Sequence, residues 1–202
     1  MLTLPAHVQP MQNLLPQNAR LLIQAGATDG QLIRSYRALY PASAMLVVEA
    51  DPGRAQEARE YAERVYLVDP LTASDGFYQQ LEWADGWFFD GTLEQYAQPL
   101  ALLQRIRTVI QPDASIVARI ANRDYWNAAA EGPRHAMALM DILQLFPLAG
   151  FRVASGVVMN SAPLPPAVEA ALRQQAAQRG GGLQDLIDAA QPSHYLIKAM
   201  PA

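Results

Sequence analysis

The chain contains no cysteine among its 202 residues. That absence excludes disulfide frameworks, thiolate zinc sites, iron–sulfur clusters and a cysteine nucleophile. Charged residues are also sparse, at 17%, and the formal net charge is −4. Because the sequence has no basic excess to hold a nucleic-acid backbone, we expect no nucleic-acid partner.

The histidines are few and far apart in the sequence, at positions 7, 135 and 194. They form no HxH, HxxxH or HExxH spacing, so we expect no dedicated metal site. The uncharged stretch 153–168 is interrupted by three prolines, and residues 1–12 have neither a basic start nor a long apolar run. We therefore expect no membrane span and no secretory signal, which favours a cytoplasmic protein.

Short apolar runs alternate with longer segments of helical spacing. The predicted strands are 19–24, 44–49, 64–68, 84–89, 114–120, 151–159 and 194–199. The predicted helices are 31–39, 52–62, 99–110, 134–148, 166–178 and 183–190. Apolar strands separated by helices are typical of a parallel sheet covered on both faces.

These elements predict a single α/β domain over residues 1–202. We expect a Rossmann-like, seven-stranded, mostly parallel sheet with helices on both faces, in which the last strand is antiparallel and the sixth and seventh strands pair at an antiparallel edge. Residues 160–193 are predicted to be a helical insertion, hinged at a run of three glycines. Its apolar stripes are too small to be stable alone, so we expect a lid over a substrate or a contact with a second copy.

Two residues that follow consecutive strands indicate a nucleoside site. Gly26 lies in the loop after the first predicted strand, where a glycine lets the backbone approach a ligand. Glu49 ends the second strand. Its spacing from Gly26 in the sequence suits a carboxylate that accepts hydrogen bonds from ribose hydroxyls. Either feature alone is more often a surface turn or a solvated carboxylate. The GxGxxG fingerprint is missing, because Thr28 stands between Gly26 and Gly30, and this disfavours a nucleotide- or NAD-linked enzyme.

The order of several segments resembles the class I S-adenosylmethionine-dependent methyltransferases. The segments that carry the resemblance are Leu21–Leu32, Val48–Pro52, Asp69, Asp90–Tyr96 and Gln111–Asp113. Later segments are similar to a small-molecule branch of that family, and they are Ala121–Asn122, Tyr125–Trp126, His135 and Ala149–Phe151. The resemblance implies S-adenosylmethionine as cofactor, a small-molecule acceptor, and a second copy or another protein as a partner.

The resemblance also implies roles for individual residues. The cofactor-binding candidates are Gln24, Gly26, Thr28, Glu49, Ala50, Asp69 and Leu93. Among them, Gly26 would line the methionine end, Glu49 the ribose and Asp69 the adenine edge. Leu93 would contact the adenine or ribose, or else belong to the core. Since Glu49 ends a strand and faces a cleft, we expect its removal to leave the fold intact.

The catalytic candidates follow the fifth predicted strand. They are His135, whose imidazole suits a general base near neutral pH, and Tyr125. The alternative for His135 is an ordinary, partly exposed histidine near a helix start.

Four positions depart from the family pattern. Gln24 replaces an acidic residue, Thr28 a glycine, Gly91 an aspartate and Gln95 a histidine. These departures favour an alternative hypothesis, in which the chain is a non-catalytic pseudo-methyltransferase that serves as a binding or partner subunit.

Overall fold

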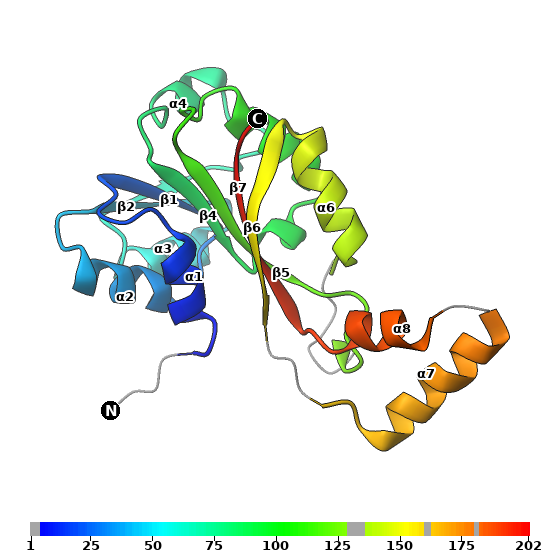
Figure 1. The fold of residues 1–202 in the computed structure, drawn as a ribbon. Coiled ribbons are helices and arrows are strands. Elements are labelled where there is room, and N and C mark those ends of the chain that lie inside the picture. Colours follow the sequence, from blue (N-terminus) through cyan, green and yellow to red (C-terminus); the bar gives the residue numbers. More distant parts are fainter. Residues whose placement is uncertain (1–4, 129–135, 160–162, 180–181) are drawn as a thin grey trace.

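The computed structural model describes residues 5–128, 136–159, 163–179 and 182–202. Its centre is a seven-stranded sheet in the order β3-β2-β1-β4-β5-β7-β6 (Figure 1). The strands are β1 (Leu21–Ala25), β2 (Ala44–Glu49), β3 (Arg64–Leu67), β4 (Gly86–Asp90), β5 (Ser115–Ala121), β6 (Phe151–Met159) and β7 (His194–Pro201). The strands β1 to β5 pair in parallel, and β7 is antiparallel to both of its neighbours. The predicted fold class is therefore confirmed.

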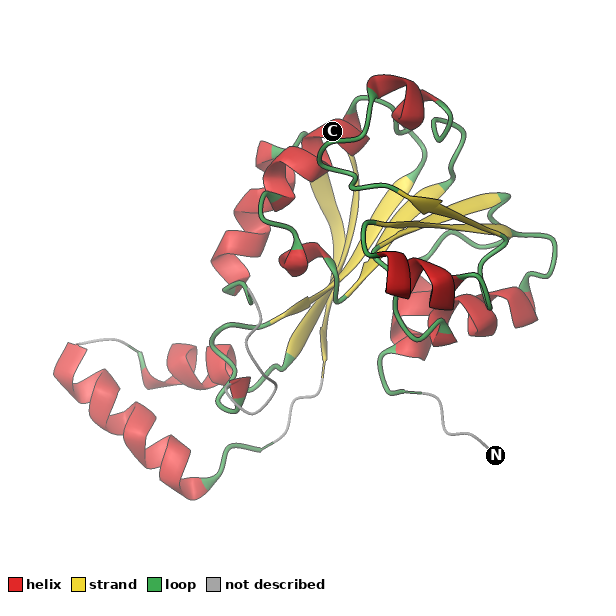
Figure 2. Cartoon of the chain, turned by 180° about the vertical axis from the view of Figure 1, so that it is seen from behind, coloured by secondary structure: helices red, strands yellow, loops and turns green. Residues whose placement is uncertain are grey.

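Helices cover both faces of the sheet (Figures 1 and 2). The helices are α1 (Val8–Leu14), α2 (Gln31–Leu39), α3 (Pro52–Ala58), α4 (Asp75–Gln79), α5 (Pro99–Arg107), α6 (Leu139–Leu148), α7 (Pro166–Arg179) and α8 (Leu183–Ala190), with a 3-10 turn η1 (Leu93–Gln95). Trp87 and Phe89 point into the core shared with α4, α5 and α6. Phe88, between them in sequence, points into the core shared with α1 and α2. This alternation along β4 is what a strand buried on both faces requires.

The expected pairing of the sixth and seventh strands is confirmed, since β6 and β7 pair antiparallel at one edge of the sheet, with β6 outermost and β7 next to β5. One detail of the sequence prediction is wrong. The predicted helix 134–148 begins only at Leu139. Ala138 is extended there, and Asp141 accepts a hydrogen bond from its N–H at 3.3 Å. The start of that prediction, residues 134–135, lies outside the described residues.

The helices α7 and α8 project from the body beside the carboxyl ends of the strands (Figures 1 and 2). Asn122, just after β5, anchors the base of this arm, since its Nδ2 donates to the carbonyls of Ala189 and Pro192 at 2.7 and 2.8 Å. Within the residues that the structure describes, no helix is both long enough and apolar enough to cross a membrane.

Candidate cofactor site

A cavity of about 320 Å³ opens at the carboxyl ends of β1, β2, β3 and β4. Ligands of open α/β sheets bind at this end of the strands, because the loops there converge. The lining residues come from the end of β2 and from the segments that follow these four strands, and they are Gly26, Glu49, Ala50, Arg54, Asp69, Leu71, Thr92, Gln95, Tyr96 and Ala97. The cavity thus brings together four of the predicted cofactor residues, Gly26, Glu49, Ala50 and Asp69.

Gly26 turns the chain sharply at the end of β1. Its φ of 82° lies in the left-handed region that favours glycine, and its N–H donates to the carbonyl of Val48 at 2.9 Å. A Cβ at this position would lie 2.7 Å from the Cβ of Thr92. The glycine is therefore required by the turn and by close packing against Thr92.

The Glu49 carboxylate holds neighbouring backbone in place and is also a candidate for binding the cofactor. Its side chain is 3% exposed and accepts hydrogen bonds from Ala27 N at 2.7 Å and Asp51 N at 2.8 Å. Arg54, in the first turn of α3, donates from Nε and Nη2 to Oε2 at 3.1 and 2.8 Å. Three of these four bonds end on Oε2, so Oε1 retains room for one ligand hydroxyl. These hydrogen bonds make Glu49 part of the local structure, and the expectation that the fold holds without it stays a prediction.

Arg54 links Glu49 to the loop after β4, and the sequence prediction missed it. Its Nη1 donates to Gln95 Oε1 at 3.2 Å, while Gln95 Nε2 donates to the carbonyl of Gly91 at 2.7 Å. The only sequence signal for this contact was the place of Arg54 in the first turn of α3, a few residues after Glu49. Gln95, one of the departures from the family pattern, therefore holds the guanidinium of Arg54 in place.

The departures at Gln24 and Thr28 belong to one hydrogen-bonded unit. Gln24 Nε2 donates to the carbonyl of Gly26 and to Thr28 Oγ1, both at 2.9 Å. A carboxylate at position 24 could donate neither bond. The hydroxyl of Tyr61 accepts from Thr28 N at 3.2 Å and donates to Thr28 O at 3.0 Å. The loop after β1 is thus held by Gln24 of β1 and by Tyr61, which follows α3.

The other cofactor candidates divide between the cavity and the core. Asp69 Oδ1 accepts from Leu71 N at 2.9 Å, which fixes the turn where both residues line the cavity. Burial, and the charge of nearby Glu49, raise the pKa of Tyr96 on the opposite wall, so its hydroxyl stays neutral. Leu93 is fully buried in the core and does not line the cavity.

Of the two catalytic candidates, Tyr125 does not line this cavity. Tyr125 is half-buried after β5, and its ring packs against Trp126 with centroids 5.6 Å apart. His135 lies outside the described residues. Across the described ranges, no group of three or more His, Asp or Glu side chains could hold a metal ion.

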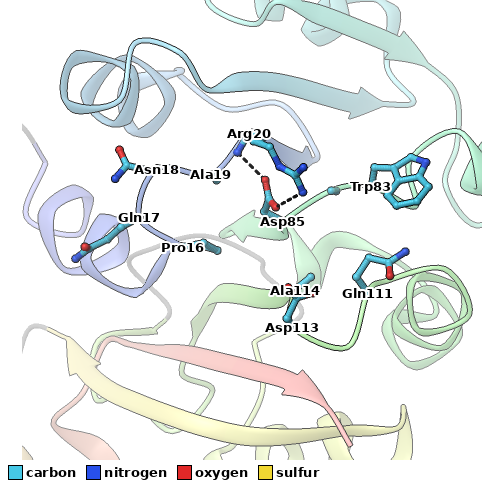
Figure 3. A pocket seen from close by; sticks show the side chains of 11 residues that line it. Pro16, Gln17, Asn18, Ala19, Arg20, Trp83, Asp85, Gln111, Asp113 and Ala114 are labelled. Atoms are coloured by element: carbon cyan, nitrogen blue, oxygen red, sulfur yellow. Dashed lines mark hydrogen bonds and ion pairs between the residues drawn. The ribbon is translucent and has the colours of Figure 1, made fainter.

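A larger opening, of about 530 Å³, lies at the other end of the sheet (Figure 3). At its centre, Asp85 Oδ2 accepts from the N–H groups of Arg20 and Leu21 at 2.6 and 3.0 Å. These bonds join the starts of β1 and β4, and Asp85 also pairs with the Arg20 side chain at 3.4 Å. Because its polar centre serves to fasten two strands, this opening is a weaker candidate than the cavity at the carboxyl ends.

No protein-family model matches the chain, and no curated protein matches it. Solved structures do. A SAM-dependent methyltransferase from Archaeoglobus fulgidus superposes with a TM-score of 0.70 and 12% identity, over 96% of this chain and 91% of that one. Geranyl diphosphate methyltransferase in complex with SAM gives 0.65 and 13%, over 98% and 85%. The [4+2]-cyclase SpnF gives 0.64 and 16%, over 96% and 79%.

Such low identities show the fold and leave the reaction open. The superpositions cover 96–98% of this chain, so the likeness in fold extends over nearly all of it. The chain therefore has the fold of the class I S-adenosylmethionine-dependent methyltransferases.

Proposed function

We propose that the chain binds S-adenosylmethionine in the cavity at the carboxyl ends of β1 to β4 and methylates a small-molecule acceptor. The observation that carries this proposal is the meeting of Gly26, Glu49 and Asp69 around one cavity. A fold neighbour in complex with SAM supports the choice of cofactor.

The residues present fit the adenosine half of that cofactor. Glu49 Oε1 has room for one ribose hydroxyl, and the Asp69 turn offers a carboxylate at the adenine edge. Leu71 and the neutral Tyr96 supply apolar and aromatic surface for the base. When bound, the cofactor supplies a methyl group already activated on a sulfonium sulfur. The protein then has to position the acceptor and accept its proton.

Calorimetric titration tests the proposal. S-adenosylhomocysteine and S-adenosylmethionine should bind with one site per chain, and NAD should not. S-adenosylhomocysteine should also raise the melting temperature, since a ligand specific for the native state adds about 2.7 kcal/mol at 100 times its Kd. Absence of binding at millimolar S-adenosylhomocysteine would contradict the proposal, and binding of NAD alone would favour the nucleotide-linked alternative.

A second candidate function is a non-catalytic subunit or an enzyme of other chemistry. The hydrogen bonds of Thr28 with Gln24 and Tyr61 favour it, because the family resemblance implies that the cofactor's methionine end would pass beside Thr28. The cyclase among the fold neighbours also shows that the fold accommodates a reaction other than methyl transfer. Cofactor binding without turnover on any acceptor would support this candidate.

Arg54→Ala should tighten S-adenosylhomocysteine binding by about tenfold. In the free protein, Arg54 satisfies Glu49 Oε2, and a ribose that uses both carboxylate oxygens must displace it. In Arg54→Ala the ribose no longer has to break that hydrogen bond, and the avoided cost is about 1.5 kcal/mol. Calorimetry on Arg54→Ala and on Arg59→Ala, an exposed arginine just after α3, provides the comparison. Weaker binding in Arg54→Ala would mean that Arg54 itself contacts the ligand.

We propose that the arm formed by α7 and α8 covers the acceptor side of the site. A short Gly/Ser loop in place of residues 164–187 keeps the anchor at Ala189 and Pro192. Since the arm does not line the cofactor cavity, S-adenosylhomocysteine affinity should change less than twofold while acceptor turnover falls. A change in mass in solution would instead identify a contact between two copies. If affinity, turnover and mass all match the parent, the arm has neither role.

A further inference from the structure

A second, smaller cavity lies on the α1 face of the sheet, at the carboxyl ends of the strands. It measures about 90 Å³ and is lined by Ala6, His7, Arg119, Met159 and His194. These residues come from the start of α1, from β5, from the last residue of β6 and from the first residue of β7. The sequence prediction assigned no role to His7, Arg119 or His194.

Asp90, the last residue of β4, joins two of these side chains. Its carboxylate is 3% exposed, with Oδ1 2.6 Å from Arg119 Nε and 3.4 Å from His7 Nε2. Arg119 Nη2 also donates to the carbonyl of Asp90 at 3.2 Å. Burial alone would raise the pKa of Asp90. The hydrogen bond from His7 and the charge of Arg119 outweigh it and lower that pKa, so the carboxylate is ionised.

His7 stands at the N-cap of α1, but its side chain makes no capping hydrogen bond. Its Nε2 is instead within reach of the Asp90 carboxylate. An ionised aspartate beside Nε2 favours the tautomer that carries the proton on Nε2, which leaves Nδ1 to accept one. The other histidine of the cavity, His194, has its Nδ1 3.0 Å from Ser193 Oγ.

One turn separates this cavity from the cofactor cavity. Gly91 follows Asp90 with a φ of 71°, and a Cβ there would lie 2.6 Å from Arg119 Nη2. The next residue, Thr92, lines the cofactor cavity. A side chain at position 91 would therefore displace the guanidinium, which accounts for the glycine where the family pattern has an aspartate.

We propose that this smaller cavity receives the nucleophilic hydroxyl of the acceptor, and that His7, oriented by Asp90, is the general base that takes its proton. The inference rests on the proposed function. A neutral hydroxyl fits better than an ion. Arg119 is already paired with Asp90 and offers no free charge to a carboxylate, and Asp90 offers none to an ammonium. Met159 and Ala6 supply apolar walls for the acceptor's carbon skeleton.

The chemistry balances with the proposed cofactor. The acceptor oxygen bonds to the methyl carbon as the carbon–sulfur bond breaks and leaves its electron pair on sulfur. The hydroxyl proton passes to Nδ1 of His7 and then to water, since the His7 side chain remains partly exposed. Asp90 keeps its charge throughout and stabilises the imidazolium that forms.

The test is nuclear magnetic resonance of protein labelled with ¹³C and ¹⁵N in histidine, with S-adenosylhomocysteine present and phenol as the hydroxyl probe. We expect His7 as the Nε2–H tautomer at neutral pH, and loss of that preference in Asp90→Asn, which keeps the side-chain volume. Phenol should shift the His7 ring signals. In His7→Phe, which keeps an aromatic ring but has no nitrogen to accept, phenol should bind about tenfold more weakly, the loss expected for one hydrogen bond. Gln9→Ala, an exposed position on the same helix, should bind phenol like the parent.

Three results would overturn the inference: the Nδ1–H tautomer or an imidazolium at neutral pH, ring signals that do not respond to phenol, and a response to acetate but not to phenol. The last result would identify an anion site. S-adenosylhomocysteine affinity, measured on the same samples, separates this inference from the proposed function. Failure of the parent to bind it contradicts the proposed function, whereas normal binding with an unresponsive His7 contradicts only the role of His7.

Discussion

Glu49→Ala should lower the free energy of unfolding by about 2–4 kcal/mol. The substitution leaves the N–H groups of Ala27 and Asp51 without their acceptor, and the guanidinium of Arg54 without its partner. Breaking a buried pair from one side costs about 3–5 kcal/mol, and the half-exposed Arg54 can turn toward water, which reduces that loss. Urea denaturation followed by circular dichroism measures the change.

Two further variants make the Glu49 result specific. Glu49→Gln keeps the volume and one acceptor oxygen, so it should lose about half as much stability as Glu49→Ala. Glu60→Ala removes an exposed carboxylate just after α3 and should change stability by no more than about 0.5 kcal/mol. If Glu49→Ala is as stable as Glu60→Ala, the carboxylate faces solvent and the described site geometry is wrong.

Gly26→Ala should cost about 2–5 kcal/mol of stability and abolish cofactor binding. A residue with a Cβ is strained by about 1–3 kcal/mol at a φ of 82°. The new Cβ would also lie 2.7 Å from the Cβ of Thr92, and such overpacking adds a similar amount. Both Gly26 and Thr92 line the cavity, so a shift of either that relieves the clash would change the place of the ligand.

The matched control is Gly76→Ala. Gly76 lies in the first turn of α4, and a Cβ there would meet nothing closer than Ser74 Oγ at 3.9 Å. Alanine favours a helix more than glycine does, so this variant should be as stable as the parent or more stable by up to about 1 kcal/mol. Equal stability of the two variants would mean that the turn at Gly26 is not as tight as described.

The sequence was enough to place the strands because most of them are short apolar runs, and the central strands β1, β4 and β5 are almost entirely buried. Asp51 was likewise predictable as the N-cap of α3, and its Oδ1 accepts from Arg54 N at 2.8 Å. The position of β7 between β5 and β6 was not predictable, since strand order depends on pairing between segments far apart in the chain. The helix α1 escaped prediction although Val8, Met11 and Leu15 are all buried along one stripe.

The candidate site was predictable only in outline. Gly26, Glu49 and Asp69 follow consecutive strands, so the topology alone brings them together. The pairing of Arg54 with Glu49 depends on how α3 packs against the loop after β4, which spacing does not reveal. The hydrogen bond between Gln24 and Thr28 was not predictable either. Each residue considered alone only departs from the family pattern, and the fold brings the two side chains together.

A crystal structure of the protein with S-adenosylhomocysteine tests the central claim most directly, namely that the cavity at the carboxyl ends of β1 to β4 is the cofactor site. The account predicts that the ribose hydrogen-bonds to Glu49 with Arg54 turned away from Oε2, and that the adenine lies between Leu71 and Tyr96. A ligand bound elsewhere, or a cavity still closed by the pair of Arg54 and Glu49 in crystals grown at saturating ligand, would contradict it.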